Sequence, residues 1–311
     1  MRVSISPGER LSVTLRFLAT EESFRSETCQ ALYEAMKQQY LKAPSTEEEW
    51  LKIADEFQAQ WNYLCCIGAL DGKHIAIQQP ADSSSEFFNY KHFFSVLLLA
   101  LVDANYKFLY VNVGATGRAR DAGVFADCSL KKALANKTLN LPPPETIEGV
   151  SEKICYHIVA DDAFPLTKNI VKPYPHRKLD KPKRIFHYRL SRARRVVENA
   201  FGILANRFRV FLTTINLRHE KVNDIILVTC CLHNFMVANN MSNYTSCQDI
   251  EDTDNQQFTP GQWRRDTQLY GIQTTSVRNS SKSAKEQRVQ LTNYFVSENG
   301  SVPWQDYMCS L

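Results

Sequence analysis

The sequence predicts an α/β protein in which helices flank a mixed β-sheet and a helical region precedes that sheet. Three features predict this class: helical periodicity in the first sixty residues, a series of strand-like apolar runs after them, and two long helical patterns after the last run. Of the 311 residues, 44% are hydrophobic and 23% are charged. This composition is ordinary for a globular protein, so most of the chain can contribute to a core.

The N-terminal region, residues 1–62, is expected to be helical. Apolar residues recur every three or four positions across residues 28–41. Thr46 is followed by three acidic residues, a pattern typical of a helix start, and predicts a helix over 46–61.

Four segments have the composition of β-strands. The first contains an Asp-Gly pair, and the second is a continuous apolar run typical of a strand buried on both faces. A tight turn at 103–105 would join the second strand to the third. A helical segment over 120–137 precedes the fourth strand. The strands are expected at residues 66–77, 93–103, 107–115 and 153–161.

Two helices are predicted after the fourth strand, at residues 188–208 and 222–240. The order β-β-β-α-β-α-α is that of the ribonuclease-H-like fold, and we assign it to one domain over residues 63–240. Residues 241–259 are rich in Ser, Asn, Asp, Gln and Thr and are expected to be a flexible excursion. Residues 241–311 therefore form a partly flexible C-terminal extension.

The basic residues are unevenly distributed. Residues 168–195 contain eleven Lys or Arg and a single acid, Asp180, whereas the whole chain has a net charge of only +4. This local block carries +10, so the rest of the chain sums to about −6. Such a block favours a polyanionic ligand, most commonly nucleic acid, with a solvated lysine-rich face as the alternative.

Cysteine usage and hydropathy narrow the class of protein. The nine cysteines include no C-x-x-C pair, so neither a disulfide framework nor a structural zinc site is expected. The most apolar stretch, residues 93–102, is too short to cross a bilayer, and the N-terminus has no long apolar run typical of a signal peptide. We expect an intracellular chain that does not use a membrane.

Three carboxylates stand out as candidates for metal-dependent chemistry. Asp71 lies inside an apolar strand, where an acid is costly unless it is paired or bound to metal. Asp161 and Asp162 follow the fourth strand, at the kind of strand end where α/β proteins place ligand sites. Glu198 lies beside the apolar seam of the following helix. Hydrolysis of a phosphodiester with two Mg²⁺ ions needs a few such carboxylates in one cleft.

Each candidate has a structural alternative. Asp71 and Gly72 could form a hairpin turn, and one of the acids at 161–162 could cap the next helix. Glu198 could pair with Arg194 on a solvated face, which is the better interpretation of the helix alone. Asp121 is interpreted as a helix N-cap or first-turn acid.

Five motifs in order resemble those of one known family. They read ALDGKHIAI, GRARDAGVFADCSL, VADDAFPL, RARRVVENAFGILANRFRVF and CCLHNFMV. Together they are similar to the PIF/Harbinger-type, DDE transposase-derived nucleases. The resemblance runs from about residue 66 to residue 239 and resumes in the C-terminal VPWQ segment.

The resemblance implies a function and its site residues. The catalytic, metal-binding residues would be Asp71, Asp161 and Glu198, with Mg²⁺ or Mn²⁺ as the cofactor and DNA as the substrate. It further implies a nuclear protein, with the cytoplasm as a second location, that works with a companion Myb-like DNA-binding protein. Whether the chain forms a homo-oligomer is left open.

The sequence departs from the family pattern in its N-terminal region, so a function without catalysis is a second hypothesis. The N-terminal region is short where relatives carry a helix-turn-helix segment, so residues 1–62 would be the remnant of a DNA-binding segment. The alternative function is a catalytically inactive, domesticated transposase that binds DNA or protein. A third class, a hydrolase using Cys231 and His233, is disfavoured because both lie on an apolar helix where buried structural cysteine is common.

Overall fold

The computed structural model describes most of the chain beyond residue 25. The described residues are 8, 11, 12, 14–16, 26–81, 83–119, 121–175, 179–241, 243–266, 269–271 and 280–310. Most of the first 25 residues of the predicted helical preface therefore lie outside the description, as do residues 176–178 of the basic block.

A mixed sheet forms the centre of the molecule, which confirms the predicted fold class. Its strands follow the order β3-β2-β1-β4-β5, and β8 pairs with β1 beyond this path. β1 pairs with β2, and β2 with β3, in antiparallel fashion, whereas β1–β4 and β4–β5 are parallel. The strands are β1 (Cys66–Ala76), β2 (Ser95–Val102), β3 (Phe108–Thr116), β4 (His157–Ala160), β5 (Ile170–Val171) and β8 (Tyr270–Gly271).

Helices pack around this sheet in the order that the sequence predicts. The predicted helix over 120–137 is divided in two at Cys128, whose side chain caps the second part by accepting from the backbone N–H of Lys131. The helices are α2 (Ser26–Tyr40), α3 (Glu47–Trp61), α4 (Asp121–Asp127), α5 (Ser129–Asn136), α6 (Lys181–Arg207), the 3₁₀ turn η1 (Arg209–Phe211), α7 (His219–Ala238), α8 (Trp263–Asp266), α9 (Lys282–Val296) and α10 (Gln305–Ser310).

Local sequence explains where the principal helices begin. Thr46 and Glu49 form a capping box at the start of α3, because each side chain bonds to the other's backbone N–H. Asp180 caps α6 by accepting from the backbone N–H of Lys183, and Pro182 lies in the first turn, where its missing N–H costs nothing. α6 thus begins several residues before its apolar seam.

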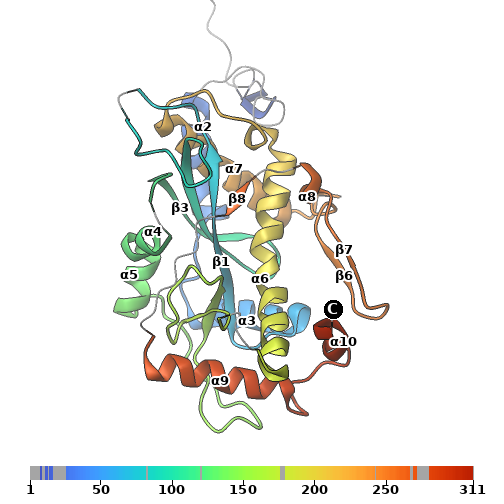
Figure 1. Cartoon of the computed structure of the whole chain (residues 1–311). Coiled ribbons are helices and arrows are strands. Elements are labelled where there is room, and N and C mark those ends of the chain that lie inside the picture. The colour runs from blue at the N-terminus through green and yellow to red at the C-terminus, as the bar shows by residue number, and fades with distance from the viewer. Residues whose placement is uncertain are drawn as a thin grey trace, which may run out of the picture.

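The long helix α6 organises the molecule. It packs against β1, β2 and β4 of the sheet and also contacts α8, α9 and α10. Figure 1 shows α6 lying lengthwise alongside β1, with α9 crossing its lower end and α10 beside its lower half. Every residue of β2 is buried, as expected for a strand in the middle of a covered sheet.

A small hairpin follows α7, in the segment expected to be a flexible excursion. β6 (Ile250–Asp252) pairs with β7 (Gln257–Thr259), and the hairpin lies along the outer side of α6 (Figure 1). Glu251 anchors it: its carboxylate pairs with Arg192 and Arg195 at 2.9 Å each and accepts a hydrogen bond from Tyr188 at 2.7 Å. An ionic cluster therefore holds this polar segment against the domain.

α7 is the one described helix whose length and hydropathy would allow it to cross a membrane. Helices in the core of a folded domain share this composition, and α7 packs against α2 and β3.

Candidate active site

Asp71 lies in the interior of a continuous strand, not in a turn. It pairs with Ala100 of β2, and only 3% of its surface is exposed. Lys73, two residues further along β1 and therefore on the same face, places its Nζ 2.9 Å from Asp71 Oδ2. The same Nζ lies 5.7 Å from the centre of the Phe201 ring of α6. Asp71 thus belongs to the face of the sheet that α6 covers.

Asp161 stands beside Asp71 because of the parallel register of their strands. Leu70 of β1 pairs with Ala160 of β4, so the two aspartates occupy equivalent positions on neighbouring strands. Burial and the negative charge of Asp71 together raise the pKa of the Asp161 carboxyl above its ordinary value. Two carboxylates therefore face one another in a poorly solvated position.

Asp162 is turned to a different partner. Lys172 places its Nζ 3.1 Å from Asp162 Oδ1 and donates a hydrogen bond to the Asp162 backbone oxygen at 2.8 Å. Asp161 instead accepts from the backbone N–H of Ala163 at 2.9 Å. Of these two acids, Asp161 is therefore the one that lies beside Asp71, while Asp162 pairs with Lys172.

Glu198 is held on α6 by two arginines. Arg194, one turn earlier, forms an ion pair with it, and Arg264 Nη2 of α8 lies 3.4 Å from Glu198 Oε2. The helical pair that the sequence offered as an alternative is therefore present. Burial would lower the pKa of the Arg194 guanidinium, but the charges of Glu198, Asp71 and Asp161 raise it above its ordinary value. Arg194 thus links the three predicted carboxylates electrostatically.

The contact between α8 and α6 delivers Arg264 to Glu198. A Cβ added to Gly202 of α6 would lie 2.2 Å from Trp263 Cδ2, so only glycine allows this approach. Trp263 Nε1 donates to Asn199 Oδ1 at 3.1 Å. Asp249, whose side chain is fully buried, fixes the Arg264 guanidinium from the other side. The segment after α7 thereby supplies a cation to the site.

The donor set fits a hard divalent cation in part. Asp71 and Asp161 offer carboxylate oxygens, which Mg²⁺ and Mn²⁺ prefer. A cation between them would offset both the burial and the repulsion from Asp71 that raise the pKa of Asp161. Within the part of the chain that the structure describes, however, no three His, Cys, Asp or Glu side chains are grouped closely enough to hold a metal. The structure brings Asp71 and Asp161 together and connects Glu198 to them through Arg194.

A groove opens from Asp161 along the N-terminal half of α6. Its volume is about 560 Å³. Its lining consists of Asp161, Asp162, Pro173, Leu179, Arg184, His187, Tyr188, Leu190, Ser191, Arg194, Arg195, Met308 and Cys309. The basic block in the sequence therefore supplies one wall of a cavity that reaches Asp161.

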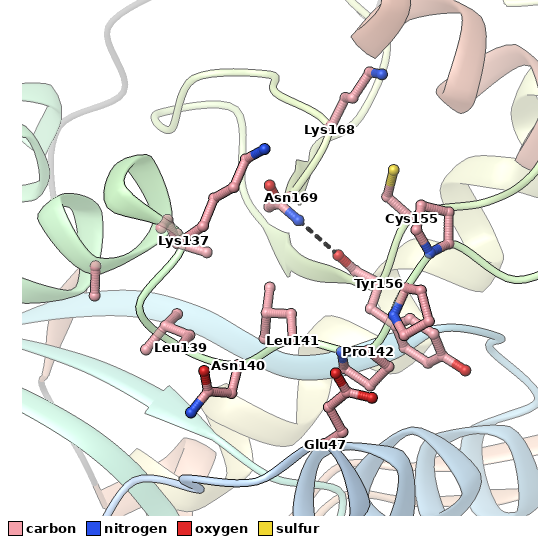
Figure 2. Close-up of a pocket in the computed structure, with 14 residues that line it drawn as sticks. Glu47, Lys137, Leu139, Asn140, Leu141, Pro142, Cys155, Tyr156, Lys168 and Asn169 are labelled. Carbon is pink, nitrogen blue, oxygen red and sulfur yellow. Dashed lines mark hydrogen bonds between the residues drawn. The ribbon is translucent and has the colours of Figure 1, made fainter.

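A second cavity, of about 530 Å³, lies at the other end of β4. Figure 2 shows Lys137, Leu139 and Asn140 on the left, Cys155 and Tyr156 on the right, Lys168 and Asn169 above, and Glu47 of α3 at the bottom. Asn169 Nδ2 donates a hydrogen bond to the Tyr156 backbone oxygen at 3.0 Å. None of the predicted carboxylates lines this cavity, so the groove beside Asp161 is the better candidate for the substrate.

The remaining candidates are structural or lie outside the description. His233 is buried between the Tyr106 carbonyl, 2.8 Å from its Nε2, and the Tyr244 hydroxyl, 2.9 Å from its Nδ1. Burial raises the pKa of the Cys231 thiol to about 12, so it is not a ready nucleophile. α4 begins at Asp121, but the side chain of Asp121 is outside the described residues.

Two cations of the site were absent from the sequence-based prediction. Lys73 had a usable signal, because residues two apart on a strand share a face. Arg264 had none, since it lies 66 residues after Glu198 and reaches it only through the docking of α8.

Comparison with known proteins decides the family. Residues 70–234, just over half of the chain, match the model of the DDE superfamily endonuclease. The chain belongs to this family. The matched range of the DDE endonuclease contains Asp71, Asp161 and Glu198. The resemblance to Harbinger transposase-derived nucleases is thereby confirmed.

Curated relatives of the chain come from plants and mammals. It is 28% identical over 240 residues to an ALP1-like protein of Arabidopsis thaliana, covering 75% of this chain and 58% of the relative. It is 25% identical over 215 residues to HARBI1 of Homo sapiens, which is named as a candidate nuclease, covering 67% of this chain and 56% of the relative. The chain thus spans little more than half the length of these relatives. No solved structure gives a significant match.

Proposed function

We propose that this chain is a metal-dependent DNA endonuclease of transposase descent. The observation that carries the proposal is the pairing of Asp71 and Asp161 at one level of neighbouring parallel strands, beside a groove lined by arginines. Two carboxylates that repel one another are a suitable seat for divalent cations, and a cationic groove suits a phosphate backbone.

Each residue then has a defined part in phosphodiester hydrolysis. Asp71, Asp161 and Glu198 would hold Mg²⁺ or Mn²⁺, which when bound activates water and stabilises the charge of the leaving oxygen. Lys73 and Arg194 offset the negative charge of the carboxylates before the substrate arrives. Glu198 can join the other two ligands when its side chain exchanges an arginine for the cation.

Nicking of supercoiled plasmid tests the proposal. With Mn²⁺, the native chain should convert supercoiled to open-circular DNA, whereas Asp71→Asn and Glu198→Gln should abolish the conversion because each removes a ligand charge. Asp127→Asn, an exposed acid at the end of α4, is the matched control and should nick as the native chain does. Thermal unfolding should show that all three variants are folded. Equal nicking by native chain and Asp71→Asn would rule the assignment out.

One observation favours the alternative, a DNA-binding protein that does not cut. Glu198 already has two arginine partners, an arrangement that is stable without metal. For this function, DNA affinity should fall steeply with salt, while neither nicking nor stabilisation by Mn²⁺ should be detectable.

The cellular setting is part of the same proposal. A protein that acts on chromosomal DNA would work in the nucleus, where a companion Myb-like DNA-binding protein could direct it to its target. Nuclear localisation of the tagged chain and its recovery with such a partner would support both statements.

A further inference from the structure

The groove beside Asp161 has two chemically different walls. One is a stripe of α6 formed by residues 184, 187, 188, 191, 194 and 195, whose spacing of three and four places them on one helix face. The other consists of Pro173, Leu179, Met308 and Cys309, which are apolar or weakly polar. A ligand of this groove should therefore be anionic along one edge and apolar along the other.

Arg184 is the outer cation of this stripe. The first turn of α6 carries three basic residues and no acid, although a helix N-terminus favours negative charge. Two of the three have carboxylate partners: Lys181 pairs with Asp306 at 2.7 Å and Lys183 with Asp180 at 2.8 Å. Arg184 is exposed, and among the described residues no ion pair involves it. No ion pair within the described residues therefore accounts for the position of Arg184 at the groove.

The inner end of the groove reaches Asp161, one of the three predicted carboxylates. Arg194 and Asp161 line the groove and also interact with one another electrostatically. From Arg184 to Arg194 the helix rises about 15 Å, at 1.5 Å per residue. The stripe therefore leads from the exposed Arg184 to Arg194, which lies beside Asp161.

We propose that this groove binds an unpaired segment of the DNA strand next to the bond that is cut, with the phosphates on Arg184 and Arg194 and the bases against the apolar wall. The inference rests on the proposed function only in taking DNA as the ligand. A volume of about 560 Å³ is of the size that holds a small ligand, and so suits one or two nucleotides but not a duplex. Single strands commonly bind in basic grooves that follow the backbone while the bases pack against side chains, most often aromatic ones.

The experiment measures DNA binding without cleavage. Fluorescence anisotropy in EDTA compares a labelled single strand with the corresponding duplex across a range of salt concentrations. We expect the native chain to prefer the single strand. Arg184→Glu should weaken single-strand binding roughly tenfold and lower the salt slope by about 0.7, because one phosphate contact is lost.

Two further variants separate charge, space and folding. Lys285→Glu on α9 makes the same change of charge at an exposed position away from the groove and is the matched control. Ser191→Trp fills the groove at an exposed position of α6 without changing charge and should also block the single strand. Arg184→Lys should restore much of the affinity, since it keeps the charge.

Two results would overturn the inference. One is that Ser191→Trp and Arg184→Glu bind the single strand with the same affinity as the Lys285→Glu control. The other is a preference of the native chain for duplex. Because no metal is present, a chain that binds as expected but never nicks plasmid would refute the nuclease function and leave the groove assignment intact.

Discussion

Replacing Arg194 by glutamine should make this chain bind divalent metal more tightly. Arg194 is the cation that interacts with all three predicted ligands, Asp71, Asp161 and Glu198. It competes with any metal for the same carboxylates. The substitution keeps a polar side chain of similar length on α6 and removes only the charge.

The size of the effect follows from Coulomb's law. A unit charge about 6 Å away is worth ~3 kcal/mol at an effective dielectric constant of 20. The Arg194 side chain is 22% exposed, so solvent screens part of this interaction. We expect a gain of about 1.4 kcal/mol, or roughly tenfold in metal affinity. Without metal, Arg194→Gln should be less stable than the native chain, because Glu198 then keeps only Arg264.

Thermal unfolding across a Mn²⁺ titration measures both effects. A ligand that binds only the folded state raises its stability in proportion to the logarithm of its concentration over Kd. Arg195→Gln is the matched control, since Arg195 is the next residue and carries the same charge but pairs with Glu251. It should lower stability without changing the response to Mn²⁺.

If Mn²⁺ stabilises Arg194→Gln no more than it stabilises the native chain, Arg194 does not compete with the metal for these carboxylates. The same result for Arg194→Gln and Arg195→Gln would mean that total charge, and not contact with the carboxylates, sets the metal affinity.

Two predictions concern stability. Glu251→Gln should lower the free energy of unfolding in urea by about 2–4 kcal/mol, because it leaves the buried Arg192 and the partly buried Arg195 without a counter-charge. Glu286→Gln breaks an exposed pair at 3.7 Å and should cost less than about 0.5 kcal/mol. Equal losses in the two variants would contradict the larger value expected for the buried pair. His157 and His233 are fully buried, and burial lowers the pKa of each to about 4, so below pH 6.5 the unfolded chain binds protons that the folded chain does not. Stability should therefore decline as pH falls from 6.5 to 4, by up to ~3 kcal/mol per histidine, and urea unfolding curves that do not change over this range would refute the assignment.

Much of the fold could be predicted because its signals are local. The run at 93–103 is predominantly apolar, and its residues Ser95–Val102 form a fully buried strand. Thr46 with its following acids marks the start of α3. β5 could not be predicted, since a strand of two residues has no periodicity. The hairpin after α7 could not be predicted, because its sequence is polar. An ionic cluster around Glu251, and not the burial of apolar side chains, holds it in place.

The candidate site was predictable to a similar extent. Asp71 could be identified because a carboxylate inside an apolar strand is costly unless it is paired or binds a ligand. Asp161 could be identified because it lies at the carboxyl end of a strand, where α/β proteins place ligand sites. Their adjacency depends on the pairing of Leu70 with Ala160, a register that no local pattern specifies. The contact of Glu198 with Arg264 depends on the close approach of α8 at a glycine.

The dependence of α6 on the end of the chain limits how far this protein can be shortened. The family match stops at residue 234, but Arg189 donates to the Gly300 carbonyl and to Gln305, and Arg192 relies on Glu251. A fragment ending at the family boundary would lose these acceptors and leave the two guanidinium groups only their bonds to Asn62 and Gln60. It would also uncover the part of α6 that α9 and α10 cover. Since a hydrogen bond to a charged group contributes roughly 1.5–3 kcal/mol, these losses are large beside the roughly 5–15 kcal/mol that typically keeps a domain folded. The last seventy residues are thus a scaffold for the helix that carries Glu198.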